Sequence, residues 1–174
     1  QDYLDKAREF YDSGLPWSLS WDSKWPGYQM LMYILTGEDL YAGDVRAFLA
    51  SWKPGGGITY TPGGLAWRDT WGPLRYSANT AFISVLARKF GVESDDWAKG
   101  QIDYLLGSNP RGSSYVCGFG NNPPQRPHHR AASCSPNIWE WCSWDDYNRD
   151  APNPNVLTGA LVGGPDMWDN YNDD

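Results

Sequence analysis

The sequence predicts a single all-α domain with long loops that we expect to be functional. Its 174 residues are the length of one ordinary domain and can bury a sizeable core. Apolar residues recur at helical spacing in residues 78–90 and, less regularly, in residues 40–52. The periodicity ends in residues 107–155, where several tryptophans argue against disorder. Several predicted helices are apolar on most sides, which suits burial between two layers of helices.

The first half of the chain alternates predicted helices with sharp turns. Residues 4–11 are the expected end of a helix, and residues 28–35 are a second helix with Gly37 as its C-cap. Residues 40–52 are a third helix, which a proline and three consecutive glycines end. Residues 58–61 then predict a short strand.

The next stretch contains the clearest amphipathic pattern. Apolar side chains in residues 78–90 are spaced to face one side of a helix, at Ala78, Ala81, Phe82, Val85, Leu86 and Phe90. Ser94 is the expected N-cap of a helix over residues 95–106, because acidic residues fill its first turn. Residues 107–155 predict irregular structure, and residues 156–162 are a short apolar run.

Charge and composition exclude several classes of partner. The chain has 14 Lys and Arg against 21 Asp and Glu, a net charge of −7, so we expect no nucleic-acid partner and no attraction to an anionic membrane. No apolar run approaches the length of a transmembrane helix. Eleven tryptophans exceed what one core needs, which favours a flat, weakly polar partner such as a sugar ring.

The cysteines allow a disulfide but do not identify it. There are three, Cys117, Cys134 and Cys142, and any pair would cross-link the loop-rich half and fit an oxidising compartment. The odd number leaves one thiol free or paired outside the chain. We expect no zinc site, because no C-x-x-C occurs and His128 and His129 are adjacent.

Two short segments combine residues that suit ligand binding. In residues 127–130 two imidazoles and a guanidinium lie in a loop that neighbouring prolines stiffen, which preorganises donors for a polar ligand or a developing charge. The alternative is a cluster that only pins the loop. In residues 71–76, Trp71, Arg75 and Tyr76 can stack on a pyranose ring and reach its hydroxyls, or else belong to the core.

The acidic residues of the C-terminal run, 166–174, leave three interpretations open. One of these carboxylates can belong to a general acid–base pair. Several together can bind Ca²⁺ through oxygen ligands. The third interpretation is a solvated acidic tail.

Longer motifs resemble a known family over nearly the whole chain. They are the segments Ser-Trp-Asp-Ser-Lys-Trp at residues 20–25, Ile-Thr-Tyr-Thr-Pro-Gly-Gly-Leu-Ala-Trp at 58–67, the segment 71–76, Asp-Tyr-Leu-Leu-Gly-Ser-Asn-Pro through His-His-Arg at 103–130, and Asn-Val-Leu-Thr-Gly-Ala-Leu-Val-Gly-Gly-Pro-Asp at 155–166. In these motifs the chain resembles the C-terminal part of the catalytic domain of a glycoside hydrolase family nine cellulase, an endo-β-1,4-glucanase.

The resemblance implies a fold and a reaction. The expected fold is an (α/α)6 barrel, of which residues 1–174 would be the C-terminal portion. The expected reaction is hydrolysis of internal β-1,4-glucosidic bonds of cellulose with inversion, in which one carboxylic acid protonates the leaving oxygen and a second carboxylate activates water. We expect cellulose and cello-oligosaccharides as substrates, secretion to the extracellular space, and no required cofactor. Calcium stays possible, for example near Asp22.

The resemblance also assigns roles to individual residues. His128 and Arg130 match the family's active-site motif and would hold the sugar at the cleavage point, and Asp173 matches an active-site aspartate. Trp71, Arg75 and Tyr76 match substrate-subsite positions.

Both defining carboxylates of the family are missing from this sequence. The general-acid Glu would follow Asp173 after a few more residues, and the catalytic base would come from an Asp-Ala-Gly-Asp motif in the N-terminal half. Asp44 in Tyr-Ala-Gly-Asp echoes that motif but sits at a different place in the family's order, so we reject it as the base. We therefore expect the isolated chain to be inactive and to need the remainder of the domain as its partner. The alternative is a non-catalytic β-glucan-binding or scaffold fragment.

Overall fold

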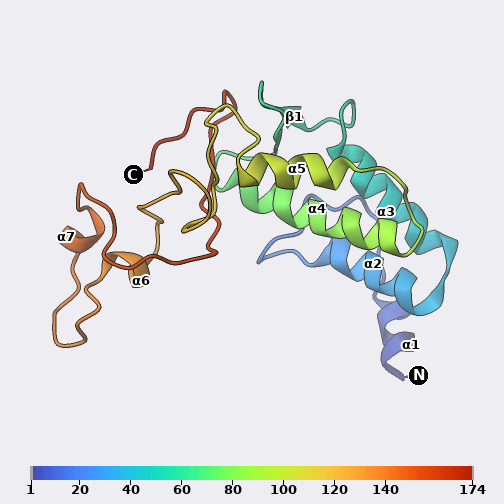
Figure 1. The fold of residues 1–174 in the computed structure, drawn as a ribbon. Helices are drawn as coiled ribbons and strands as arrows, with labels where there is room; N and C mark the ends of the chain where they lie inside the picture. Colours follow the sequence, from blue (N-terminus) through green and yellow to red (C-terminus); the bar gives the residue numbers. More distant parts are fainter. Residues whose placement is uncertain (1, 174) are drawn as a thin grey trace.

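The computed structural model describes residues 2–173. Five helices of two or more turns make up the first part of the chain: α1 (Asp2–Glu9), α2 (Trp25–Thr36), α3 (Asp39–Trp52), α4 (Pro73–Lys89) and α5 (Trp97–Leu106). The second part is irregular apart from two helices of a single turn, α6 (Arg130–Ser133) and α7 (Trp144–Tyr147). Figure 1 shows α2 to α5 stacked side by side, with the long loops at the opposite end of the molecule. Within residues 2–173, no helix is long and apolar enough to cross a membrane.

The helices pack mainly on their chain neighbours. α2 lies against α3 and α4 against α5, while α4 also contacts α2, α3 and the strand β2 (Figure 1). A core cluster fills the space between α2, α3 and α4, with Val45, Phe48 and Trp52 of α3 against Ile83 and Ala87 of α4. Burying these side chains contributes about 1.5–3 kcal/mol each for the larger ones, so this cluster fixes the helical part of the fold.

A small hairpin connects α3 to α4 and confirms the predicted strand. β1 (Thr59–Tyr60) pairs antiparallel with β2 (Ala66–Trp67), with Thr59 opposite Trp67 and Tyr60 opposite Ala66. The hairpin turn fits closely against the loops, because a Cβ on Gly63 would meet the Pro110 ring at 2.4 Å.

A second core cluster joins the helices to the irregular half. Leu65, Leu74, Tyr104, Leu105 and Tyr115 are buried together, and partly buried side chains from the end of the chain, Leu161, Val162 and Tyr171, pack against them. The C-terminal loops are therefore fixed against the helices by apolar contacts, which holds their polar side chains in defined positions.

Asp169 adds a polar link to this second cluster. Its carboxylate accepts the backbone N–H of Gly63 at 2.6 Å and the hydroxyl of Tyr104. Burial, and then this hydrogen bond, raises the pKa of Tyr104 above its ordinary value.

Helix α4 buries only part of the apolar stripe that its sequence predicts: Ala81 is buried, and Leu86 and Ala78 pack against the two core clusters. Phe82 and Val85, part of the predicted core stripe, are exposed, with Phe82 57% accessible. The buried face combines Leu74 and Ile83 with small hydroxyl residues such as Thr80, whose hydroxyl donates to the carbonyl of Tyr76 at 2.9 Å. Small side chains fit where α2, α3 and α5 approach α4 closely, so α4 also buries hydroxyl residues that the apolar pattern does not mark.

Other boundaries also differ in detail. α5 starts at Trp97 rather than residue 95, and its N-cap is Asp96 rather than Ser94; the side chain of Asp95 accepts the backbone N–H of Trp97 at 3.1 Å. The short apolar run at residues 156–162, for which no element was predicted, contributes an isolated bridge between Val116 and Leu161. The irregular structure predicted for residues 107–155 is confirmed except for the two single-turn helices.

Candidate functional site

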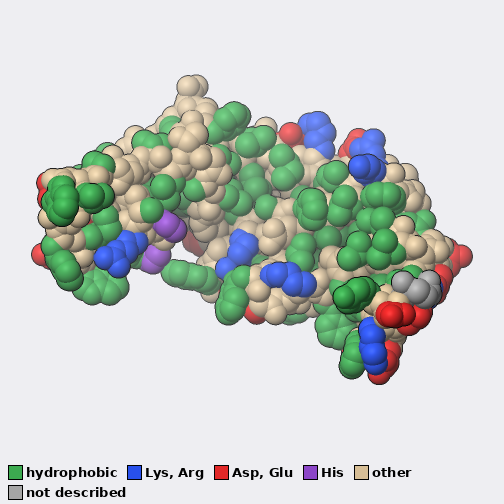
Figure 2. All heavy atoms as spheres, turned by 90° about the horizontal axis from the view of Figure 1, so that it is seen from below, with side chains coloured by type: hydrophobic (Ala, Val, Ile, Leu, Met, Phe, Trp, Pro, Cys, Tyr) green, Lys and Arg blue, Asp and Glu red, His purple; other side chains and the backbone are tan. Residues whose placement is uncertain are grey.

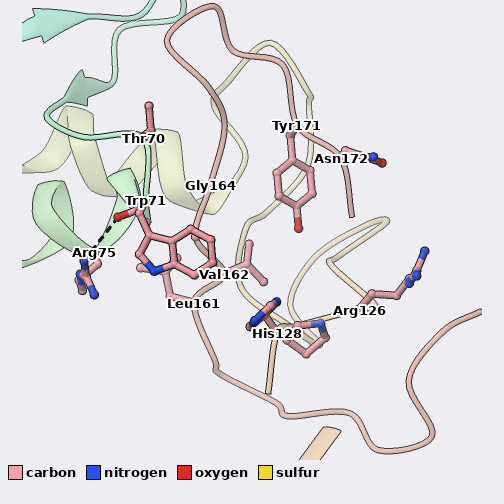
Figure 3. Close-up of a pocket in the computed structure, with 13 residues that line it drawn as sticks. Thr70, Trp71, Arg75, Arg126, His128, Leu161, Val162, Gly164, Tyr171 and Asn172 are labelled. Atoms are coloured by element: carbon pink, nitrogen blue, oxygen red, sulfur yellow. Dashed lines mark hydrogen bonds between the residues drawn. The ribbon is translucent and has the colours of Figure 1, made fainter. Parts of the chain in front are cut away.

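A cavity of about 400 Å³, called cavity 1, lies where the loops meet the start of α4. It is lined by residues 70–72, Arg75, residues 126–128, residues 161–164 and residues 171–172. Figure 3 shows that the rings of Trp71 and Tyr171 converge on the space beside His128, while the side chain of Arg126 extends away from Trp71. Two of the segments singled out in the sequence, 71–76 and 127–130, therefore meet at one site.

The backbone around Gly72 explains why Trp71 projects into cavity 1. Gly72 is the N-cap of α4 with φ of 69°, a conformation that glycine adopts without strain. The next amide, of Leu74, donates to the carbonyl of Gly163 at 3.1 Å, which ties the start of the helix to the opposite wall of the cavity. A Cβ on the neighbouring Gly164 would lie 2.3 Å from the Leu74 side chain. Trp71, directly before this fixed turn, is 70% exposed and lines the cavity.

Arg75 and Tyr76 are adjacent in the sequence, but only Arg75 lines cavity 1. Arg75 lines cavity 1, and its Nη2 donates to the hydroxyl of Tyr76 at 2.7 Å and to the carbonyl of Trp71 at 3.4 Å. Its Nε is buried without a partner among the described residues. Tyr76 is buried and does not line cavity 1, so its contact is to Arg75 rather than to the open space. Its predicted contact with substrate stays a prediction.

His128 stands at the centre of the site, on the loop of residues 123–130, here called the proline loop. The hydroxyl of Tyr147 lies 2.6 Å from its Nε2, and Trp71 packs edge-on against the imidazole with 5.8 Å between ring centroids. The loop itself is held by Asn153, whose amide side chain donates to the carbonyl of Pro127 at 3.1 Å. These contacts orient an exposed imidazole between two aromatic rings.

Arg130 is the first residue of α6 and lines a second cavity rather than cavity 1. His129 caps this helix, because its Nδ1 accepts the backbone N–H of Ala131 at 3.1 Å. Asn155 holds the other end by donating to the carbonyl of Cys134 at 2.7 Å. Among residues 2–173, no hydrogen bond or ion pair of the Arg130 guanidinium is found, so its donors are available to a ligand. Figure 2 shows the histidines on an exposed face, with Lys or Arg side chains on either side.

Asp173 fastens the end of the chain to the proline loop. Its carboxylate accepts the backbone N–H groups of Gln125 at 2.6 Å and Arg126 at 3.4 Å, and the hydroxyl of Tyr171 at 2.9 Å. Burial, followed by this bond to Asp173, raises the pKa of Tyr171 above its ordinary value. Tyr171 and Asn172 line cavity 1 but Asp173 does not, so in this structure its contacts position the loop. A direct catalytic role of Asp173 stays a prediction.

The structure shows which of the cysteine pairs left open by the sequence forms a disulfide. Cys134 and Cys142 form a disulfide, and Cys117 is buried and unpaired. Burial, and the nearby charge of Asp173, raises the pKa of the Cys117 thiol. Within residues 2–173 there is no group of three or more His, Cys, Asp or Glu side chains that could hold a metal ion. The last acid of the C-terminal run, Asp174, lies outside the described residues.

The geometry of cavity 1 suits binding more than proton transfer. It offers aromatic faces, an imidazole, two guanidinium groups and backbone amides, and no Asp or Glu is among its described lining residues. The contact of Tyr147 with His128 was not predicted, because the two residues are nineteen positions apart in irregular chain and no sequence pattern marks such a contact.

Comparisons with known proteins identify the family to which the chain is similar. The family model for Glycosyl hydrolase family 9 matches residues 1–174. The chain is 44% identical to an endoglucanase of Dictyostelium discoideum, covering 99% of this chain but 24% of that protein, and 39% identical to Endoglucanase B of Cellulomonas fimi, covering 94% and 17%. It thus spans a quarter or less of the length of these relatives.

Solved structures agree in fold. The endoglucanase from the termite Nasutitermes takasagoensis has a TM-score of 0.87 at 43% identity, covering 99% of this chain and 40% of that one. Endoglucanase CelQ from Clostridium thermocellum, complexed with cellotriose, has a TM-score of 0.86 at 40% identity, covering 99% and 31%. The helices described above are therefore part of an (α/α)6 barrel, as the sequence predicted, and the chain belongs to glycosyl hydrolase family 9.

Proposed function

We propose that this chain is the C-terminal portion of the catalytic domain of an endo-β-1,4-glucanase, which hydrolyses internal bonds of cellulose. The main supporting observation is that Trp71 and His128, from segments far apart in the sequence, meet across cavity 1. The names of the relatives, and the cellotriose in the CelQ structure, agree with a cello-oligosaccharide as the ligand.

The side chains around cavity 1 divide the work of holding a glucan. The exposed face of Trp71 stacks on the apolar face of a glucosyl ring, and Arg75 donates to its hydroxyls. His128 holds the sugar at the cleavage point from the other side of cavity 1, together with Arg130, which does not itself line this cavity. Because Tyr147, Trp71 and the proline loop already fix the imidazole, little conformational entropy is lost on binding.

The acid and base of the inverting reaction come, in this proposal, from the remainder of the domain. Inversion needs two carboxyl groups about 6.5–9.5 Å apart, one on each side of the scissile bond. Asp44 does not serve as the base, because it lies on α3, where it accepts the hydroxyl of Tyr11 at 2.6 Å, and it does not line cavity 1. The chain supplies substrate binding and the imidazole–guanidinium pair, and the isolated chain is expected to be inactive.

The remainder of the domain is also the proposed partner of the outward apolar surface. Leu31 and Leu35 of α2, with Phe82 and Val85 of α4, are exposed. Exposed apolar surface on this scale marks an interface, and the relatives are longer than this chain. Secretion is proposed from the substrate, which cells meet outside, and from the Cys134–Cys142 disulfide, which is typical of oxidising compartments. No cofactor is required in this scheme, and calcium binding stays a prediction.

The second candidate function is a β-glucan-binding or scaffold fragment without catalysis. It is favoured by one observation, that no carboxylate is among the described lining residues of cavity 1. Such a fragment would bind cello-oligosaccharides and never release reducing ends.

A hydrolysis assay separates the two functions. The complete domain, meaning this chain together with the remainder that the relatives contain, is incubated with carboxymethylcellulose, and reducing ends are counted. We expect turnover by the complete domain and none by the isolated chain, since losing a general acid or base lowers the rate about 10²–10⁴-fold each. Binding without turnover by the complete domain would support the scaffold function instead.

A further inference from the structure

A second and larger cavity adjoins the proposed active site. This cavity 2 has a volume of about 670 Å³ and is lined by the aromatic side chains of Trp141, Trp144 and Tyr147, together with Arg130 and His128. His128 lines both cavities, so they are neighbouring parts of one surface.

A continuous series of ring contacts runs from one cavity into the other. Trp71 packs edge-on against His128 at 5.8 Å, His128 against Tyr147 at 4.8 Å, and Tyr147 against Trp144 at 5.6 Å between centroids. Each contact is close to perpendicular, the geometry that aromatic pairs favour. The series therefore forms a fixed wall of rings shared by both cavities.

The far end of this wall is a loop held in shape by covalent and hydrogen bonds. The disulfide between Cys134 and Cys142 closes it, and we call residues 134–142 the tryptophan loop. At its tip the side chain of Asn137 donates to Glu140 at 3.0 Å. Just beyond the loop, the hydroxyl of Ser143 accepts the backbone N–H of Asp145 at 3.1 Å in the capping box of α7. Trp141 is thus presented by a rigid support although 90% of it is exposed.

The chemistry of cavity 2 fits a neutral sugar chain better than a charged ligand. Its aromatic faces suit the apolar faces of glucosyl rings, and the guanidinium of Arg130 has no ion pair among residues 2–173 to prevent it from donating to hydroxyls. Glu140 and Asp145 directly adjoin Trp141 and Trp144 in the sequence, and their carboxylates, with the net charge of −7, disfavour a polyanion.

We infer that the glucan continues from cavity 1 across His128 into cavity 2, and that Trp141 is a stacking platform for glucosyl units distant from the cleavage point. This inference rests on the proposed function. It makes the tryptophan loop a determinant of chain length: short cello-oligosaccharides fill cavity 1 alone, and longer ones gain the contact with Trp141.

Trp141 and Trp139 make a matched pair for the test. Both lie in the tryptophan loop and both are almost fully exposed, at 90% and 88%, but only Trp141 lines cavity 2. The values of kcat/KM are measured for cellotriose and cellohexaose with the complete domain and its variants W141A, W139A and W141F. We expect W141A to lower the ratio of the cellohexaose value to the cellotriose value about tenfold. W139A should have the same ratio as the unsubstituted domain, and W141F should have a ratio close to that of the unsubstituted domain.

The possible results separate this inference from the proposed function. An unchanged ratio in W141A, or an equal fall in W139A, would overturn the platform while hydrolysis itself continued. No hydrolysis of either oligosaccharide by the unsubstituted domain would overturn the proposed function and this inference together. A thermal melt of each variant shows whether a fall in rate reflects unfolding rather than the lost ring.

Discussion

Replacing Trp71 by Ala should weaken oligosaccharide binding by an amount that follows from its exposure. A tryptophan side chain offers about 200 Å² to its surroundings. Trp71 is 70% exposed, and a sugar ring on one face covers about half of the free part, roughly 70 Å². At ~25 cal/mol per Å², the lost contact is worth about 1.8 kcal/mol, or about twentyfold in the dissociation constant.

Titration calorimetry of the complete domain with a thio-linked cellotetraose, which is not hydrolysed, measures this effect. Trp168 provides the control, because it is 66% exposed but does not line cavity 1. W168A should bind as the unsubstituted domain does. An affinity of W71A within twofold of that value, or an equal loss in W168A, would refute the stacking role.

Further predictions concern catalysis and stability. In the complete domain H128A and R130A should each lower kcat while changing the melting temperature little, since each removes polar contacts worth about 1.5–3 kcal/mol to the bound sugar. Unchanged steady-state kinetics in both variants would count against the assignment. The fold should lose stability in urea titrations as the pH rises above about 10, the ordinary tyrosine value. Burial first, and then a hydrogen bond to an aspartate, raises the pKa of Tyr11, Tyr104 and Tyr171, so their contribution is complete below that pH and declines above it. A free energy of unfolding that stays constant up to pH 11 would contradict this prediction.

The helices were predictable where the chain itself dictates them. The apolar runs that predicted α2 and α3, and the Gly37 C-cap with φ of 69°, reappear in the structure. Only part of the buried face of α4 was predictable, because hydroxyl residues such as Thr80 are also buried by close helix packing, which hydrophobic spacing does not register.

The site was predictable as segments but not as contacts. Arg75 and Tyr76 are adjacent, yet consecutive helix positions point about 100° apart, so one lines the cavity and the other enters the core. The choice of Cys142 as the partner of Cys134, and the approach of Tyr147 to His128, depend on loop paths without any periodic pattern.

The central claim is that a glucan lies in cavity 1, stacked on the exposed face of Trp71 and within reach of His128. A crystal structure of the complete domain with thio-linked cellotetraose tests it most directly. The account predicts a glucosyl ring stacked on Trp71, with its hydroxyls within about 3.2 Å of His128 or Arg130. An oligosaccharide bound at another surface, with cavity 1 filled only by water, would contradict it.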